Sequence, residues 1–272
     1  MMGDFFIHDI DPVLFRIGPL KIAWYGISYA ISFLIGLLLV KKNLAKKGIQ
    51  LPAEHYGDFL FAIIFGVMIG GRLGYVFFYR LTDYMQNPWH IFAVWEGGMS
   101  FHGGMLGVII AALIFCKKYK YNFYTLADPT MPLVAIGVGI VRMANFINGE
   151  LYGSITNVPW AVIFFRTDPL RLPRHPSQIY ESFLEGFLMA ILLQFLLFKI
   201  KLKGIIFWLF IGIYGIVRFL IEFIRLPDDI SLYANGMLFG CFSMGQVLSL
   251  LMIAVAVFSI ILINYREMTV TK

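Results

Sequence analysis

Charged and polar side chains interrupt the long apolar stretches of this chain at regular spacing. Tyr214, Arg218, Glu222 and Arg225 lie at i, i+4, i+8 and i+11, on one face of a helix. Arginine binds phosphate through a planar fork of donors that stays charged. The spacing therefore predicts an anion-binding face. The alternative is a structural Arg218–Glu222 ion pair that ties helices together, and both hold if Glu222 orients Arg218.

A second group of polar residues ends another apolar stretch. Arg142 and Asn145 share a helix face at i, i+3, and Asn148-Gly149 is a turn signal that is expected to end the helix. Asn145, Asn148 and Glu150 are then expected to cluster near the outer interface. Capping of a helix end would explain Asn148 and Gly149, but it does not explain an arginine two turns deeper.

Glycines surround His102 in a third segment, residues 95–104, where a helix is expected to begin. Glycine allows the backbone to approach a ligand closely, and free N–H groups at a helix N-terminus suit an anion. His102 is either a proton acceptor or a hydrogen-bonded structural residue. Arg72, in the glycine-rich residues 70–75, could add a cationic contact, although helix packing is the favoured role of those glycines.

Metal and cofactor chemistry have no signature in the sequence. The five histidines stand at unrelated positions and give no metal-ligand spacing. A nucleotide-binding glycine loop and a serine nucleophile elbow are also missing. We therefore expect no metal site and no cofactor.

The composition places these residues in a membrane protein. Of the 272 residues, 60% are hydrophobic and 14% are charged, against about 25% charged in a soluble domain. A soluble domain of this length cannot bury so much apolar surface. A soluble enzyme, a disordered chain and a disulfide scaffold are therefore excluded. The net charge of +6 would suit nucleic acid, but in a membrane protein the position of charges matters more, and no nucleic-acid partner is expected.

Seven apolar segments have the length of about 20 residues that a membrane span needs. A charged residue near the centre of a span costs about 2.5–3.5 kcal/mol, so the arginines should face a polar cavity. Pro129 and Pro132 are expected to open the fourth segment, and Ser177 to cap the fifth. The segments are 20–40, 57–79, 98–116, 127–147, 177–199, 204–224 and 237–263.

Lysine clusters orient these segments. They follow the first and third segments and join the fifth to the sixth, which the positive-inside rule assigns to the cytoplasm. The N-terminus is then outside and the C-terminus cytoplasmic, the same parity that seven spans require. We expect an all-α, multi-pass, membrane-embedded catalytic domain over residues 1–272. Residues 148–176 should form a small external cap, with a β-prone run from Val158 to Phe165.

Buried arginines that open to the outer leaflet suggest a phospholipid head group as ligand. An enzyme acting on a phospholipid and a transporter of phospholipids or organic anions could both use them. Transporters often carry inverted repeats and broken helices in matching halves. The sequence has no detectable repeat, which favours the enzyme.

Motifs along nearly the whole chain resemble the prolipoprotein diacylglyceryl transferase family. The most specific one is Asn145-Phe146-x-Asn148-x-Glu150-x-x-Gly153, preceded by Arg142. The chain departs from the family pattern at Val141, where Gly is frequent, and at Ala23, where Arg is frequent. The other matching blocks are 24–26, 70–75, 95–104, 175–181, 214–228 and 244–246.

The resemblance implies a reaction in the bacterial cytoplasmic (inner) membrane, the first step of lipoprotein maturation. The diacylglyceryl group of phosphatidylglycerol is transferred to the lipobox cysteine thiol of a prolipoprotein signal peptide. A thioether forms and glycerol 1-phosphate is released. The expected partners are phosphatidylglycerol, the prolipoprotein and the surrounding membrane lipids.

The resemblance also suggests roles for individual residues. Arg142 and Arg218 would bind the phosphate and stabilise its departure. His102 is the candidate base for the thiol, although the positive field of the arginines could stabilise the thiolate alone. The residues expected to bind and orient the substrate are Tyr25, Arg142, Asn145, Glu150, Gly153, Tyr214 and Glu222.

Overall fold

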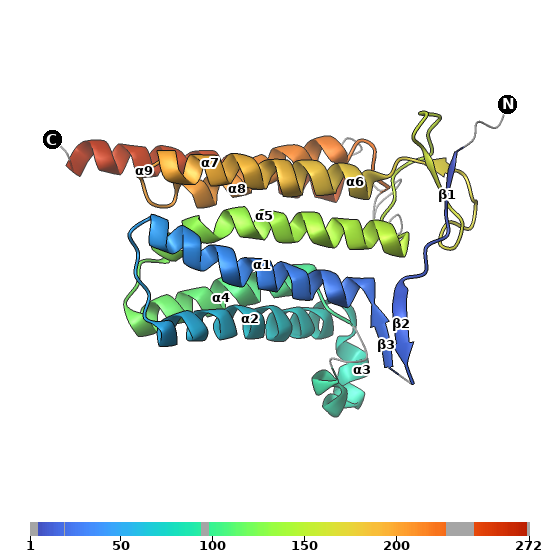
Figure 1. Cartoon of the computed structure of the whole chain (residues 1–272), viewed down its shortest axis with the longest axis horizontal. Helices are drawn as coiled ribbons and strands as arrows, with labels where there is room; N and C mark the ends of the chain where they lie inside the picture. Colours follow the sequence, from blue (N-terminus) through green and yellow to red (C-terminus); the bar gives the residue numbers. More distant parts are fainter. Residues whose placement is uncertain (1–4, 19, 94–97, 227–241, 271–272) are drawn as a thin grey trace. The chain divides into compact units, whose positions relative to one another are not determined.

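The computed structural model describes residues 5–18, 20–93, 98–226 and 242–270, without the side chains of residues 20, 78, 79, 101, 102 and 270. These parts of the chain are mostly helical (Figure 1). The long helices are α1 (Trp24–Lys46), α2 (Ala53–Tyr79), α4 (Phe101–Tyr119), α5 (Phe123–Asn148), α8 (Ile205–Ile221) and α9 (Met244–Val270). A further long helix consists of α6 (Ser177–Glu181), a π-helical segment (Ser182–Leu188) and α7 (Met189–Lys199). The short helices are α3 (Leu81–Gln86) and the 3-10 turn Pro88–Phe92.

Among the described residues, five helices are long and apolar enough to cross a membrane, which makes this a multi-pass membrane protein. The other two apolar helices, α4 with 19 residues and α8 with 17, are shorter. A total of seven spans therefore stays a prediction. The five are Trp24–Lys46, Ala53–Phe77, Phe123–Asn148, Ser177–Lys199 and Met244–Thr269.

Several helix boundaries differ from the prediction because local caps fix them. The fourth predicted helix, α5, begins at Phe123, and Pro129 and Pro132 lie inside it. The Asn122 side chain accepts hydrogen bonds from the next backbone amides, which starts the helix early. The seventh predicted helix, α9, begins at Met244, where Ser243 and Gln246 form a reciprocal capping box. Residues 237–241 lie outside the described part.

Two small sheets accompany the helices, and the mostly helical structure agrees with the predicted all-α class. β2 (Val13–Ile17) pairs antiparallel with β3 (Leu20–Ala23), so residues 20–23 are a strand and the first helix begins at Trp24. β4 (Val162–Phe164) pairs with β5 (Pro173–Arg174) and, in parallel, with β1 (Phe6–His8). β4 lies inside the predicted β-prone run. Strands of two to five residues carry too little periodicity to be recognised in a sequence.

The chain forms two compact units, residues 44–126 and the remainder. In the larger unit, buried side chains of α5, α7 and α8 form the core, and α8 packs along α9. These core residues are Ala135, Met189, Ala190, Leu193, Leu197 and Ile206.

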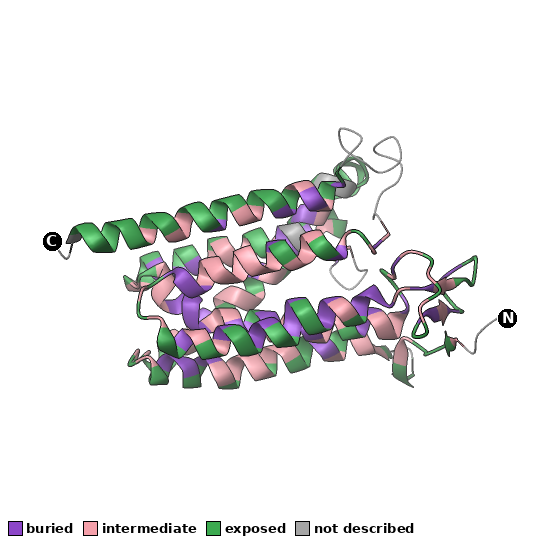
Figure 2. Cartoon of the chain, turned by 90° about the horizontal axis from the view of Figure 1, so that it is seen from above, coloured by how far each residue is buried: buried purple, intermediate pink, exposed green. Residues whose placement is uncertain are grey.

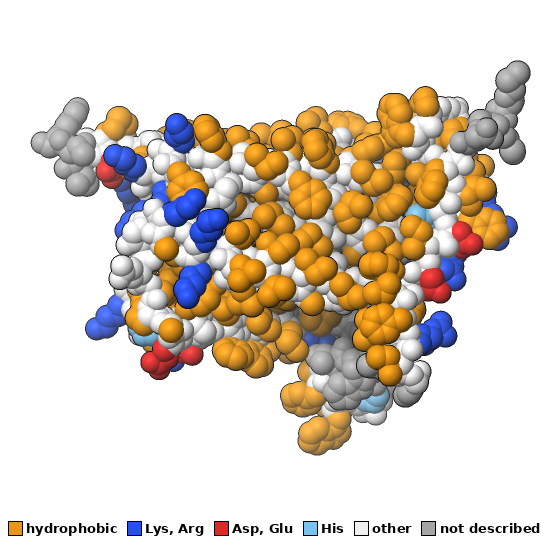
Figure 3. Space-filling view, viewed as in Figure 1, with side chains coloured by type: hydrophobic (Ala, Val, Ile, Leu, Met, Phe, Trp, Pro, Cys, Tyr) orange, Lys and Arg blue, Asp and Glu red, His pale blue; other side chains and the backbone are white. Residues whose placement is uncertain are grey.

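Large apolar side chains cover the exposed faces of the helices. Leu38 on α1, Ile191 on α7 and Phe258 on α9 are 67%, 69% and 62% exposed. Figure 2 shows α9, which leads to the C-terminus, as largely exposed, and hydrophobic side chains dominate the face in Figure 3. Monomeric soluble proteins rarely expose contiguous apolar patches beyond a few hundred Å². Lipid is the solvent that suits these faces.

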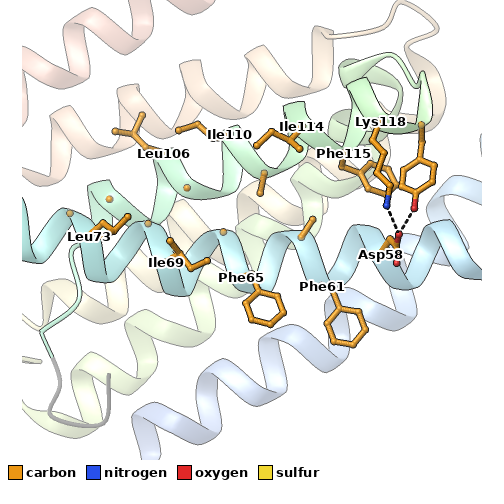
Figure 4. A pocket seen from close by; sticks show the side chains of 18 of the residues that line it. Asp58, Phe61, Phe65, Ile69, Leu73, Leu106, Ile110, Ile114, Phe115 and Lys118 are labelled. Carbon is orange, nitrogen blue, oxygen red and sulfur yellow. Dashed lines mark hydrogen bonds and ion pairs between the residues drawn. The ribbon is translucent and has the colours of Figure 1, made fainter. Parts of the chain in front are cut away.

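In the smaller unit, glycines bring α2 and α4 into backbone contact. A methyl group on Gly103 would collide with the carbonyl oxygen of Gly70, and one on Gly107 with that of Gly66. An apolar groove of about 710 Å³ runs along the two helices (Figure 4). At one end of it Lys118 Nζ lies 3.3 Å from Asp58 Oδ2, to which the Tyr119 hydroxyl also donates. Packing, the favoured role of the glycines at residues 70–75, is therefore confirmed.

Replacing Gly107 with alanine is expected to destabilise the protein by about 1–3 kcal/mol, because the new methyl group meets backbone that cannot move aside. The thermal unfolding midpoint in detergent measures the loss. Gly104→Ala is the matched control, since the nearest atom to its new methyl group is 3.6 Å away. Equal midpoints for the two variants would contradict the close contact.

Candidate active site

Two carboxylates lie close to the side chain of Arg142 on α5: Glu181, the last residue of α6, and Glu185, in the π-helical segment. Arg142 Nη2 lies 2.9 Å from Glu181 Oε2 and 3.6 Å from Glu185 Oε2. Both glutamates are fully buried. Residues four apart lie on nearly the same face of a helix. The continuous helix of α6 and the π-helical segment therefore directs both carboxylates at one guanidinium.

A glycine contact holds the two helices in this position. A methyl group on Gly186 would collide with Gly139 of α5, and the Ser182 hydroxyl donates to the Gly139 carbonyl at 2.8 Å. Gly139 precedes Arg142 by less than one turn. The backbones therefore approach closely where the arginine must meet Glu181.

Three arginines converge on one oxygen of Glu181. Besides Arg142, Arg218 Nη1 lies 3.9 Å and Arg225 Nη1 3.7 Å from Glu181 Oε2. These side chains are only 15%, 14% and 5% exposed in the order Arg142, Arg218, Arg225. Within the described residues, Arg218 Nη1 and both Glu181 oxygens have no hydrogen-bond partner. The group, here called the arginine cluster (Arg142, Arg218, Arg225), retains unused donor capacity.

Glu222 orients Arg218 from the other side. Its Oε2 lies 2.9 Å from Arg218 Nη2, and its Oε1 accepts a hydrogen bond of 2.9 Å from the hydroxyl of Ser243. The predicted Arg218–Glu222 pair is therefore present, and it links the end of α8 to the start of α9. Tyr214, one turn before Arg218, interacts with the guanidinium of Arg142.

Asn145, Asn148 and Glu150 form the predicted cluster at the end of α5. The amide nitrogen of Asn145 donates to Glu150 Oε1 at 2.7 Å, and that of Asn148 donates to the same oxygen at 3.4 Å. The helix ends at Asn148, and Gly149 takes a φ of +69°. Gln178 also donates to the Glu150 carbonyl at 2.7 Å. Both the predicted helix end and the cluster are confirmed.

Gly153 positions Arg225 through the backbone. It forms a bridge with Arg225, and its N–H donates to the His175 carbonyl at 2.8 Å. α8 ends at Ile221, so Arg225 lies beyond the helix and not at i+11 on its face, as the spacing predicted. Turn residues and this bridge bring Arg225 back toward Glu181.

The remaining predicted residues lie elsewhere or outside the description. The centroid of the Tyr25 ring lies 5.2 Å from that of the Tyr29 ring. Tyr29 in turn interacts electrostatically with Glu150. His102 is the second residue of α4, in the smaller unit, and its side chain is not described. Arg72 directs its guanidinium to the carbonyls of His90, Ile91 and Gly98, so it holds backbone in place.

Sequence reasoning missed Glu181 and Glu185. A signal existed, because two acidic residues at i, i+4 interrupt the otherwise apolar stretch 177–199. In this stretch the sequence indicated a role only for Ser177, as the helix cap. Ser177, predicted to be that cap, is instead the first residue of α6, and its hydroxyl donates to the Leu151 carbonyl at 3.0 Å. No group of three or more potential metal ligands occurs in the described part of the chain.

A second buried ion pair holds residues 148–176 together. Arg174 Nε and Nη2 donate to Asp168 at 2.6 and 2.9 Å, and the Leu170 and Leu172 amides donate to the same carboxylate. Burial alone would raise the pKa of Asp168, but these hydrogen bonds outweigh it and hold the pKa below its usual value. The pair therefore stabilises the loop only while Asp168 is ionised.

The loop is expected to open as the pH falls below about 4, the ordinary pKa of aspartate. Because the pKa of Asp168 is lower in the folded loop, the ion pair stabilises the loop fully above that pH, and this stabilisation is lost as Asp168 becomes protonated below it. Pepsin cleavage within residues 150–176, followed from about pH 5 to pH 2.5 against an unfolded reference, measures the opening. Asp168→Asn should be cleaved readily across this range. Identical profiles for both proteins would contradict the role of Asp168.

Comparison with known proteins decides the family. The profile described as "Prolipoprotein diacylglyceryl transferase" matches residues 12–262. The chain belongs to this family. The motifs that carried the resemblance to the prolipoprotein diacylglyceryl transferase family lie in the matched range.

Curated relatives extend this membership over nearly the whole chain. A protein of Geobacter sulfurreducens named phosphatidylglycerol–prolipoprotein diacylglyceryl transferase is 44% identical over 95% of this chain and 97% of its own length. Proteins of the same name from Vibrio vulnificus and Vibrio campbellii are 47% and 45% identical, over 89% and 92% of this chain and 87% and 89% of their own lengths.

Proposed function

We propose that this chain transfers the diacylglyceryl group of phosphatidylglycerol to the lipobox cysteine thiol of a prolipoprotein. In this reaction the sulfur attacks a glyceryl carbon, the carbon–oxygen bond to the phosphate breaks, and glycerol 1-phosphate leaves. A thioether remains on the cysteine. The names of the relatives support the lipid and prolipoprotein substrates, and membership of the family supports the transferase class.

One observation carries the proposal for the site: three arginines, each at most 15% exposed, lie within 3.9 Å of one oxygen of Glu181. The leaving phosphate gains negative charge as its ester bond breaks. Fixed guanidinium donors stabilise that charge more in the transition state than in the ground state. Arg142 and Arg218 would bind the phosphate, with Glu222 and Tyr214 orienting them. Asn145, Glu150, Tyr25 and Gly153 would shape the remaining surface.

The thiol must lose its proton, because an ordinary cysteine has a pKa of about 8.5. His102 is one candidate acceptor, and the positive field of the arginine cluster is the alternative. His102→Gln separates them: if His102 is the base, kcat falls by about 10²–10⁴-fold and the acidic limb of the pH profile disappears. Retained activity with an unshifted profile would assign thiolate formation to the arginines.

We also infer seven spans in the bacterial inner membrane, with the N-terminus outside and the C-terminus cytoplasmic. Long apolar helices and the lysines that follow α1 and α4 support this topology. Residues 148–176 would then form an extracytoplasmic cap of one membrane-embedded domain. An alkaline phosphatase fusion after residue 120 should be inactive, and an active fusion would overturn the orientation.

The assay that tests the function uses purified protein, phosphatidylglycerol and a lipobox peptide in detergent, without added cofactor. The expected result is a mass gain of one diacylglyceryl group on the peptide cysteine. The transporter reading finds no support in the named relatives, which are transferases. Absence of transfer, together with anion flux in liposomes, would reverse that choice.

A further inference from the structure

Glu181 occupies the centre of the arginine cluster. Its Oε2 lies 2.9, 3.9 and 3.7 Å from Arg142, Arg218 and Arg225, and the side chain is fully buried. Among the described residues, neither of its oxygens receives a hydrogen bond. It is therefore held by charge, at the point where an anion would make the most contacts with the three guanidinium groups.

The other two carboxylates are bound differently. Glu222 pairs with Arg218 at 2.9 Å and also accepts a hydrogen bond from Ser243, so two contacts fix it. Glu185 also accepts no hydrogen bond among the described residues, but its one ion pair there, with Arg142, is 3.6 Å long. Of the three, Glu181 competes most directly for the donors that a phosphate would need.

The charge balance makes this competition strong. The three arginines and three glutamates of the group sum to zero when all are ionised. A phosphodiester that carries one negative charge gains little net attraction from such a group. It must take guanidinium donors away from a carboxylate that already uses them.

We propose that Glu181 is an internal counter-ion that the substrate phosphate replaces on the arginine cluster. The inference rests on the proposed function and adds one step to it, in which the substrate phosphate takes the place of the Glu181 carboxylate on the arginines. Glu181 occupies the donors before the lipid binds and competes for them again once glycerol 1-phosphate has formed. Glu181 is thus a positioning residue that limits the affinity for head group and product, and so speeds product release.

Glu181→Gln tests the exchange, because it removes the competing charge and keeps the size of the side chain. The cluster then sums to +1, and a bound phosphodiester returns it to zero. Phosphatidylglycerol should bind about tenfold tighter in detergent titrations, whereas diacylglycerol, which lacks the phosphate, should bind unchanged. KM should fall, kcat should fall with it, and glycerol 1-phosphate should inhibit more strongly.

Two further variants keep the test decisive. Asp83→Asn makes the same charge change at an exposed pair with Arg80, and its affinity for the lipid should match wild type. Glu181→Asp keeps the charge but shortens the side chain, so its affinity should fall between wild type and Glu181→Gln. If Glu181→Gln does not fold, Glu181→Asp alone must still bind tighter than wild type.

The outcomes separate this inference from the function itself. Unchanged or weaker phosphatidylglycerol binding by the Glu181 variants, with wild-type transfer intact, would overturn the exchange and leave the function standing. If the variants bind phosphatidylglycerol more tightly but the wild-type protein shows no transfer activity, the exchange is supported and the function is rejected. Equal tightening for diacylglycerol would show that the phosphate is not what Glu181 competes with, which also overturns the proposal.

Discussion

Arg142→Lys is expected to lower kcat/KM for diacylglyceryl transfer by about 10²–10³-fold, the usual loss when one donor to a developing negative charge is removed. Arg142 contacts Glu181 and Glu185 through Nη2 and also interacts with Tyr214. A lysine ammonium keeps the charge but not the planar fork, so it cannot bind a carboxylate and a phosphate oxygen in the same geometry. Initial rates with phosphatidylglycerol and a lipobox peptide measure the loss.

The matched control for this experiment is Arg80→Lys. Arg80 forms an exposed ion pair with Asp83, with both side chains more than half exposed, so the same substitution should leave the rate unchanged. Wild-type turnover by Arg142→Lys, at equal expression and folding, would remove Arg142 from the proposed phosphate site. Arg218→Lys tests the second arginine in the same way.

Gly153→Ala is expected to reduce transfer by about 10²-fold or more, because displacement of catalytic groups by about 1 Å has costs of this size. A methyl group on Gly153 would lie 2.6 Å from the Ile224 carbonyl oxygen and 2.7 Å from His175 Cβ. Backbone cannot rotate away as a side chain can. The segment that carries Arg225 would therefore move away from Glu181.

Gly137→Ala is the control for Gly153→Ala, since its methyl group would make an ordinary contact of 3.7 Å with Ser32. Thermal unfolding of both variants distinguishes a lost site from a lost fold. Gly153→Ala should remain folded and monodisperse. Overpacking should lower its stability by about 1–3 kcal/mol, and its thermal unfolding midpoint falls accordingly. Normal activity in this variant would contradict the backbone role of Gly153.

The long helices were predictable because their signal is strong. An apolar run of about 20 residues forms a membrane-spanning helix far more readily than any other structure, and each predicted segment overlaps a helix of the described chain. Boundaries were less predictable, since single side chains such as Asn122 and Ser243 fix them. The short strands β1 and β4 were not predicted as a pair, because their partners are far apart in the sequence.

The sequence could identify the charged residues of the site, because charges inside apolar segments are energetically unfavourable, but it could not predict how they are arranged. Periodicity placed Arg218 and Glu222 together, and the structure has them paired. It could not show that Arg142 and Arg225, on different segments, meet the same glutamate. Glu181 was missed because the start of its helix was interpreted only as a cap at Ser177. The π-helical segment that follows it and carries Glu185 has no sequence signature.

The pairing of β1 with β4 has a consequence for the order of biosynthesis. Phe6 pairs with Val162, more than 150 residues later in the chain. At about 5–20 residues per second, roughly 8–30 s separate the synthesis of these two strands. The first strand must wait with its backbone unpaired until most of the helices have been inserted. Completion of this sheet is therefore a late event, and a stalled ribosome before residue 164 would leave the N-terminal strand open to proteases and chaperones.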